Sequence, residues 1–152
     1  MLKHVNIALL TVSDTRGIND DTSGDILAER IIAAGHNIVD RTILRDDTTL
    51  ITARLHNWID DDQVDVVIST GGTGLTGRDV TPEALDRVKT KEIPGFGELF
   101  RWLSFASIGT STIQSRACVF ATGQDGPSHQ QFHALQTKNA SSVSAYKSKV
   151  WV

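Results

Sequence analysis

The chain is poor in cysteine and proline. Cys118 is the single cysteine in 152 residues, which excludes a disulfide within the chain. Only three residues are proline, 39% are apolar and 22% are charged, a composition typical of a globular domain and not of a disordered chain. The length suits one domain with a buried core. With so little cysteine, a cytoplasmic location is the default expectation.

An excess of positive charge and a long apolar run are also missing. Lys and Arg number 15 against 18 Asp and Glu, a formal charge of -3, which disfavours the basic stripe that nucleic-acid binding requires. No apolar run approaches the length of a membrane span. The start, MLKHVNIALLTVSDTR, lacks a small-residue cleavage site and predicts a first strand, not a signal peptide. We therefore expect neither nucleic acid nor membrane as partners.

Apolar, β-branched runs alternate with helical patterns in the first half of the chain. Strands are expected at 6–13, 37–44 and 64–70, with amphipathic helices between them that have Thr22 and Thr48 as N-caps. Strand–helix alternation of this kind implies right-handed crossovers between parallel strands. The predicted fold class is therefore α/β, a doubly wound parallel sheet with helices on both faces.

Acids and a serine follow each predicted strand. Ligands of a doubly wound sheet bind beyond the carboxyl ends of its strands, so these side chains should meet at one rim. They are Ser13, Asp14, Asp46, Asp47 and Asp79. An alternative is open for acids near helix starts, which could merely complement a helix dipole; these are Asp14, Asp20, Asp21 and Asp47. It explains Asp79 less readily, because Asp79 lies between the glycines and a Thr-Pro helix start.

Four glycines crowd the stretch GGTGLTG at 71–77, after the third strand. A dinucleotide fingerprint would need the first strand, and a P-loop would need Lys and Ser/Thr where Arg78 and Asp79 stand, so both are disfavoured. Glycines let successive N–H groups turn toward an anion, which favours an oxyanion-binding loop over a plain tight turn. Arg78 is either a phosphate partner or a solvated surface residue. The expected ligand-binding residues here are Ser13, Gly71, Gly72, Thr73, Gly74 and Thr76.

Three segments carry a resemblance to a known family: VSDTRGINDDTSG, STGGTGLTGRDVTPEAL and EIPGFGELFRWLSFASIGTSTIQSRA. They resemble the MoaB/MogA molybdenum cofactor biosynthesis proteins, and the MoaB branch more closely, from about Asn6 to Ala117. The resemblance implies a molybdopterin-binding domain over residues 1–117. It also implies a reaction, the transfer of AMP from ATP to the terminal phosphate of molybdopterin with release of pyrophosphate.

The resemblance further implies which residues form the site. Asp46 and Asp79 match the catalytic pair, which would hold Mg²⁺ together with ATP; Mg²⁺ commonly takes one or two carboxylates plus phosphate oxygens. Pro94, Gly95 and Glu98 match a loop near the pterin pocket, although a helix entry with an acid in its first turn explains them equally well.

The implied partners are molybdopterin, ATP, other cofactor-biosynthesis proteins and further copies of the chain, as a homotrimer or homohexamer. The apolar segment Phe96 to Phe105 is expected to form core or subunit interface, with Trp102 at the interface. Two other functions stay open: a non-catalytic molybdopterin-binding relative, and an oligomeric scaffold without small-molecule chemistry.

Residues 118–152 depart from the family pattern. The family continues with an apolar strand and a Pro-Gly turn, whereas Ser, Gln, Lys and Asn dominate here and only CVFA, at 118–121, predicts a brief strand. We therefore expect an atypical, poorly packed tail in which part of the family fold is missing or altered. The abrupt change favours a shifted reading frame over genuine divergence, and resequencing the gene separates the two.

Overall fold

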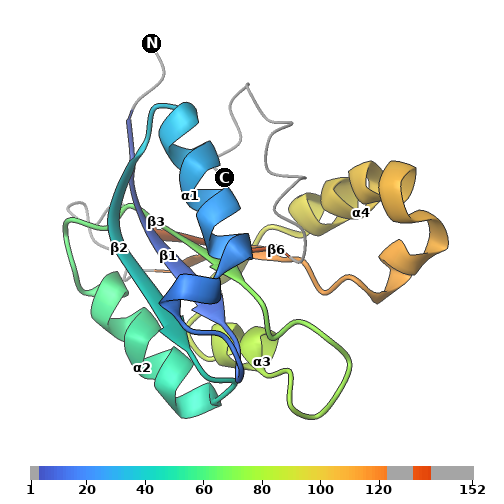
Figure 1. Cartoon of the computed structure of the whole chain (residues 1–152), viewed down its shortest axis with the longest axis horizontal. Coiled ribbons are helices and arrows are strands. Elements are labelled where there is room, and N and C mark those ends of the chain that lie inside the picture. The colour runs from blue at the N-terminus through green and yellow to red at the C-terminus, as the bar shows by residue number, and fades with distance from the viewer. Residues whose placement is uncertain (1–3, 123–131, 138–152) are drawn as a thin grey trace.

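The architecture is a six-stranded sheet in the order β2-β1-β3-β6-β5-β4 with helices on both faces (Figure 1). The structure is a computed structural model that describes residues 4–122 and 132–137. β1, β2, β3 and β6 run parallel, and β5 is antiparallel to its neighbours β6 and β4. The predicted doubly wound α/β fold is confirmed, with one antiparallel strand inserted. The strands are β1 Asn6–Val12, β2 Asn37–Leu44, β3 Val66–Thr70, β4 Lys91–Glu92, β5 Val119–Thr122 and β6 Phe132–Thr137.

The helices bury two separate apolar layers against the sheet. Side chains alternate between the faces of a strand, so neighbouring residues of β1 serve different layers. Leu9 packs in the layer that contains Leu27 of α1, and Leu10 packs in the layer that contains Leu55 of α2 and Leu85 of α3. Among the described residues, no helix is long and apolar enough to cross a membrane. The helices are α1 Thr22–Ala33, α2 Thr48–Ile59, α3 Thr81–Asp86 and α4 Pro94–Ile108, with short 3-10 turns η1 Ile18–Asp20 and η2 Gly109–Gln114.

Aspartates, and not the expected threonines, cap the first two helices. Asp21 caps α1 by accepting from the Gly24 amide, and Asp47 caps α2 by accepting from two amides at 2.8 and 3.0 Å. Thr22 and Thr48 are instead the first residues of their helices. A carboxylate accepts the amide hydrogen bonds and also interacts favourably with the positive end of the helix dipole. The helix-start explanation thus holds for Asp21 and Asp47.

The expectation that only CVFA forms a strand beyond residue 117 is wrong. Residues Phe132–Thr137 form β6, which pairs in parallel with all five residues of β3 and antiparallel with β5. Strand pairing is made by backbone groups, so the place beside β3 can be filled by a short segment of mixed composition, FHALQT, that gives little sign of a strand by itself. The rest of the expected loosely packed tail, 123–131 and 138–152, lies outside the described residues, and the division at residue 117 stays a prediction.

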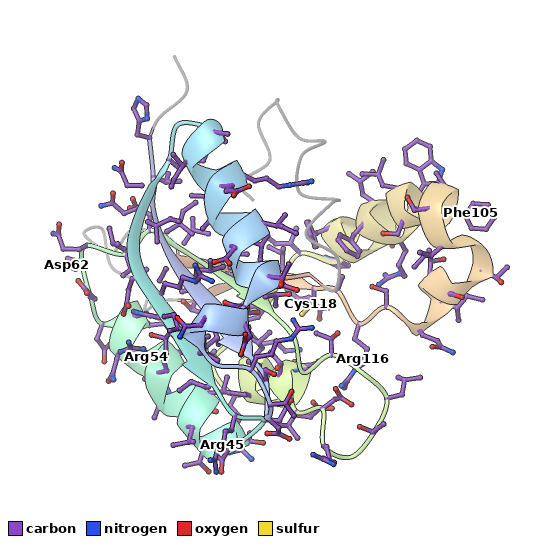
Figure 2. The ribbon with its side chains drawn as sticks, viewed as in Figure 1. Arg45, Arg54, Asp62, Phe105, Arg116 and Cys118 are labelled. Atoms are coloured by element: carbon purple, nitrogen blue, oxygen red, sulfur yellow. The ribbon has the colours of Figure 1, made fainter. Side chains whose placement is uncertain are left out.

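The helix α4 extends away from the sheet and exposes apolar side chains (Figures 1 and 2). Phe100 is buried and Phe96 packs on the layer that contains α1. Trp102 is 72% exposed, and Phe105 is 57% exposed. The core role expected for this segment therefore holds for its first turns only.

Candidate active site

A cavity of about 530 Å³ opens at the carboxyl ends of β1 and β3. The chain leaves β1 toward β2 on one side and returns to β3 on the other, so the cavity lies at the topological switch point where such sheets bind ligands. Its walls come from the end of β1 and the loop after it, from α1, and from the segments after β2 and β3. The lining residues are Thr11, Val12, Ser13, Asp14, Thr15, Arg16, Ser23, Asp46, Thr70, Gly71, Thr76, Arg78 and Asp79.

Part of the predicted site is brought together at this cavity. Six of the residues predicted for this rim or its ligand line it, and Asp47 does not; the six are Ser13, Asp14, Asp46, Gly71, Thr76 and Asp79. Gly72, Thr73 and Gly74 belong to the same loop but are not among the lining residues. Pro94, Gly95 and Glu98 are exposed in the first turns of α4 and do not line the cavity either, so their role as pocket residues stays a prediction.

Gly71 and Gly72 are required by backbone geometry. Both have positive φ angles, 92° and 60°, a region that side chains rarely tolerate. A Cβ on Gly71 would collide with the Val12 carbonyl oxygen, and one on Gly72 would collide with the Asp46 carboxylate. These two glycines therefore let the loop lie directly against β1 and Asp46. Gly77 has open space around it, and no such reason applies there.

Asp46 is held between the two neighbouring loops. Its carboxylate Oδ1 accepts from the Val80 amide at 3.2 Å, and its own amide donates to Asp14 Oδ1 at 3.1 Å. Burial raises the pKa of the Asp46 carboxyl above its usual value, the Val80 hydrogen bond opposes this, and the carboxylates of Asp14 and Asp79 add to the rise. Three carboxylates thus create a negative potential that a cation would offset.

Asp79 anchors the glycine loop as well as lining the cavity. The Thr76 hydroxyl donates to its carboxylate, and this bond is the main reason why the pKa of Asp79 is lowered. Hydrogen bonds from the amides of Gly74 and Thr76 and the positive charge of Arg116 lower this pKa further. The predicted anion-binding loop therefore already engages the Asp79 carboxylate, through the Thr76 hydroxyl.

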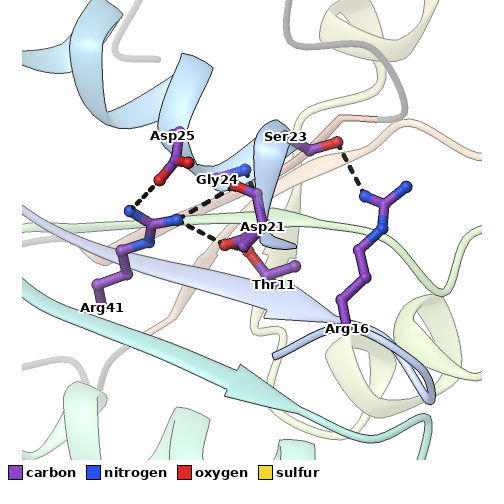
Figure 3. A network of polar contacts seen from close by, with 7 residues as sticks. All are labelled: Thr11, Arg16, Asp21, Ser23, Gly24, Asp25 and Arg41. Atoms are coloured by element: carbon purple, nitrogen blue, oxygen red, sulfur yellow. Dashed lines mark hydrogen bonds and ion pairs between the residues drawn. The ribbon is translucent and has the colours of Figure 1, made fainter. Parts of the chain in front are cut away.

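Two arginines add positive charge to the wall of the cavity. Arg78, with its side chain 82% exposed, pairs with Asp14 at 3.2 Å. The pKa of Asp14 is lowered by the Asp46 amide first and by Arg78 second. Arg16 donates to the Ser23 hydroxyl at 3.4 Å (Figure 3). Guanidinium groups bind phosphate well, so both arginines suit an anionic ligand once they release these partners.

The acids fit a magnesium ion that arrives with a nucleotide. Throughout residues 4–122 and 132–137, no group of three or more His, Cys, Asp or Glu side chains is placed to hold a metal ion. Mg²⁺ needs fewer protein ligands, because phosphate oxygens and water complete its coordination. Asp46 and Asp79 both line the cavity and supply the hard oxygen donors that Mg²⁺ prefers.

A buried ion pair supports the wall behind the cavity (Figure 3). The fully buried Asp21 accepts from the Thr11 hydroxyl and from Arg41, both at 2.8 Å, and Arg41 also pairs with Asp25 at 2.7 Å. Burial opposes ionisation of Asp21, but the hydrogen bonds from Arg41, Thr11 and the Gly24 amide outweigh it, and the pKa of Asp21 is lowered. The network joins β1, β2 and the start of α1.

Several residues of this region are absent from the site predicted by sequence. Arg16 and Ser23 lie within the segment VSDTRGINDDTSG, directly after the first strand. This position beyond the carboxyl end of a strand could have indicated that they belong to the site. Thr11, next to last in β1, and Thr70, the last residue of β3, belong to strands that are buried along most of their length, and the sequence pattern assigns such residues to the core. Arg116 contacts the glycine loop from a segment 37 to 43 residues further along the chain, and no local pattern indicates this contact.

The two acids of the cavity are expected to affect stability in opposite directions. Because the pKa of Asp46 is raised on folding, the contribution of this group to the free energy of unfolding is full below the unfolded pKa. It is lost as pH rises through the pKa of the folded state. Because the pKa of Asp79 is lowered, its contribution is present above the unfolded pKa and is lost as pH falls through the folded value. At pH 7, Asp46→Asn should therefore keep or raise the free energy of unfolding, and Asp79→Asn should lower it.

Urea unfolding at pH 7 and at about pH 3 measures both effects. The difference between Asp46→Asn and the wild type should change at the lower pH, where the raised pKa of Asp46 keeps this carboxyl protonated. The difference for Asp79→Asn should start to shrink below the usual pKa of an aspartate and should vanish only as pH falls through the lowered pKa of the folded state. If Asp46→Asn lost as much free energy of unfolding at pH 7 as Asp79→Asn, the result would contradict the opposite pKa shifts of the two acids.

The fold and the cavity define a doubly wound α/β domain with a polar cavity of carboxylates, hydroxyls and guanidiniums at the carboxyl edge of its sheet. A family model described as "Probable molybdopterin binding domain" matches residues 8–136. The chain therefore belongs to this family, and its resemblance to the MoaB/MogA proteins is confirmed.

Named relatives agree with this family. The chain is 53% identical over 111 residues to molybdenum cofactor biosynthesis protein B of Escherichia coli (strain K12), a match that covers 73% of the chain and 65% of that protein. A crystal structure of a molybdenum cofactor biosynthesis protein B superimposes with a TM-score of 0.81 at 37% identity, over 93% of this chain and 84% of that one. The tungsten cofactor synthesizing protein MoaB from Pyrococcus furiosus also gives 0.81, at 29% identity over 94% and 88%.

Proposed function

We propose that this protein acts in molybdenum cofactor biosynthesis, where it binds molybdopterin and transfers AMP from ATP to the terminal phosphate of the pterin. The observation that carries the proposal is the meeting of Asp46, Asp79 and the glycine loop at one cavity. Family membership and the names of the relatives support the pterin as ligand. The match spans less than two thirds of the Escherichia coli relative, so the activity of that whole protein is carried over here only as a proposal.

The reaction joins two anionic groups. A pterin phosphate oxygen attacks the α-phosphorus of ATP, a P–O bond forms there, and the bond to the β-phosphate breaks, so that pyrophosphate leaves. Asp46 and Asp79 would hold Mg²⁺, which when bound offsets the repulsion between the phosphates and the charge on the leaving group. Arg16 and Arg78 would exchange their present partners for phosphate oxygens, and the Ser13 hydroxyl would donate to them.

A second function, pterin binding without transfer, is favoured by one contact. The Asp79 carboxylate is already engaged by the Thr76 hydroxyl and by loop amides, which reduces its freedom to bind a metal. Isothermal titration with molybdopterin and with ATP in the presence of Mg²⁺ separates the possibilities. The transferase requires both to bind, a non-catalytic relative requires the pterin only, and a scaffold requires neither.

We expect the protein to assemble as a trimer or a multiple of three. The apolar side chains that α4 and η2 leave in solvent would be covered at such an interface; they are Trp102, Phe105, Ile108 and Ile113, which are 44% to 81% exposed. Multi-angle light scattering at micromolar concentration should give a mass near three or six times 16.5 kDa. Trp102→Glu should shift the mass toward the monomer, and a wild-type monomer would contradict the prediction.

A further inference from the structure

Arg116 lies beside the loop between β3 and α3 (Figure 2), and it hydrogen-bonds three carbonyl oxygens of that loop. Its Nε donates to Thr73 at 3.2 Å, and its Nη2 donates to Gly74 at 2.5 Å and to Asp79 at 2.9 Å. The other nitrogen, Nη1, pairs with the Glu83 carboxylate at 2.6 Å. A planar guanidinium with five N–H donors suits such a set of acceptors, and the side chain is only 25% exposed.

One of these carbonyls belongs to the peptide group whose N–H donates to Asp46. In a trans peptide, the C=O of one residue and the N–H of the next point in opposite directions. The Asp79 carbonyl that Arg116 holds shares its peptide with the Val80 N–H, which points away from the guanidinium and donates to Asp46 Oδ1 at 3.2 Å. Arg116 therefore orients the amide that holds the Asp46 carboxylate.

A second peptide that Arg116 holds lies beside the other acid, Asp79. The Thr73 carbonyl shares its peptide with the Gly74 N–H, and Gly74 lies directly against the Asp79 carboxylate: a Cβ built on it would be 2.6 Å from Asp79 Oδ2. We propose that Arg116 is a positioning residue, which holds these two peptides and thereby sets where the carboxylates of Asp46 and Asp79 lie in the cavity. The role in catalysis rests on the proposed function, whereas the positioning itself does not.

Amide hydrogen exchange, followed by NMR on the protein without substrate, tests the positioning. In Arg116→Lys and Arg116→Gln we expect the amide of Val80, which donates to Asp46, to exchange about tenfold faster than in the wild type, the size of effect expected when a hydrogen bond is lost. Lysine keeps the charge but cannot donate in a fixed fork to three carbonyls. The buried amide of Leu9, in β1, should keep its wild-type rate and so report that the fold is intact.

Glu83→Gln is the matched control, because it removes the ion pair but leaves the three carbonyl contacts of Arg116 in place. Its Val80 amide should exchange at the wild-type rate. Wild-type exchange in Arg116→Lys would overturn the proposal, and so would equal acceleration in Glu83→Gln, since the ion pair to α3 would then order the loop.

Kinetics test the consequence for the reaction. A misplacement of about 1 Å can cost about a hundredfold in rate, so Arg116→Lys should lower kcat by about that factor while the KM for molybdopterin stays near the wild-type value. A wild-type kcat in this variant would overturn the catalytic consequence. A wild type that transfers no AMP would instead refute the proposed function, and the exchange rates would still decide the positioning.

Discussion

Asp46→Asn is expected to lower the turnover number for AMP transfer by about 10²–10³-fold, the usual cost of losing one electrostatic contact to a transition state. Asparagine keeps the shape and can still accept from the Val80 amide, but it removes the charge that would hold Mg²⁺. Binding of molybdopterin should change little, because the loss falls on the transition state and not on the ground state. Asp79→Asn should cost a similar factor and, in addition, loosen the loop that Asp79 anchors.

The neighbouring acid supplies the control for this experiment. Asp47 caps α2 through two backbone amides, and asparagine is nearly as good a cap, so Asp47→Asn should keep its turnover and its stability. Steady-state kinetics with ATP and molybdopterin, together with pterin titrations, measure the comparison. A fully active Asp46→Asn enzyme would contradict the catalytic role of this acid, although not the family.

Asp21→Ala is expected to lower the free energy of unfolding by about 1.5–5 kcal/mol, since α1 loses its cap (about 0.5–2 kcal/mol) and the buried Thr11 hydroxyl loses its acceptor (about 1–3 kcal/mol), while Arg41 keeps its pair with Asp25. Asp21 is fully buried, pairs with Arg41, accepts from Thr11 and caps α1. The loss is a large part of the about 5–15 kcal/mol that stabilises a typical domain. Because Thr11 lines the cavity, ligand binding should weaken too.

Urea unfolding of Asp21→Ala beside Asp25→Asn tests the assignment. Asp25 pairs with the same arginine, Arg41, but its side chain is 56% exposed, and such surface pairs contribute about 0–1 kcal/mol. The pKa of Asp21 is lowered in the folded state, so its stabilisation is present above the unfolded pKa and disappears as pH falls through the folded value. Equal losses in the two variants at pH 7 would refute the special role of the buried acid.

Those parts of the fold that depend on local pattern were predictable from sequence. The buried runs that become β1 and β3 and the amphipathic stretches that become α1 and α2 carry their own periodicity. The caps were missed by one residue, because Asp21 and Thr22, or Asp47 and Thr48, are both good capping types. β6 was missed because its place is set by pairing with β3 and β5, far away along the chain.

The same distinction explains the site. The meeting of Asp46 and Asp79 was predictable because parallel strands bring their carboxyl ends to one edge of the sheet. The difference between the two acids was not predictable. The raised pKa of Asp46 and the lowered pKa of Asp79 depend on burial and on hydrogen bonds that only the folded loop creates. The role of Arg116 was not predictable for the same reason, because it contacts the glycine loop through backbone carbonyls, which leave no mark in the sequence.

Direct detection of AMP transfer is the most decisive measurement. The wild-type protein is incubated with molybdopterin, Mg²⁺ and ATP that carries a radioactive α-phosphate, and the pterin is separated and counted. We expect label on the pterin, one pyrophosphate released for each adenylyl group transferred, and loss of both in Asp46→Asn but not in Asp47→Asn. Pterin that binds to the protein but remains unlabelled would contradict the proposed transferase and leave a molybdopterin-binding protein without this activity.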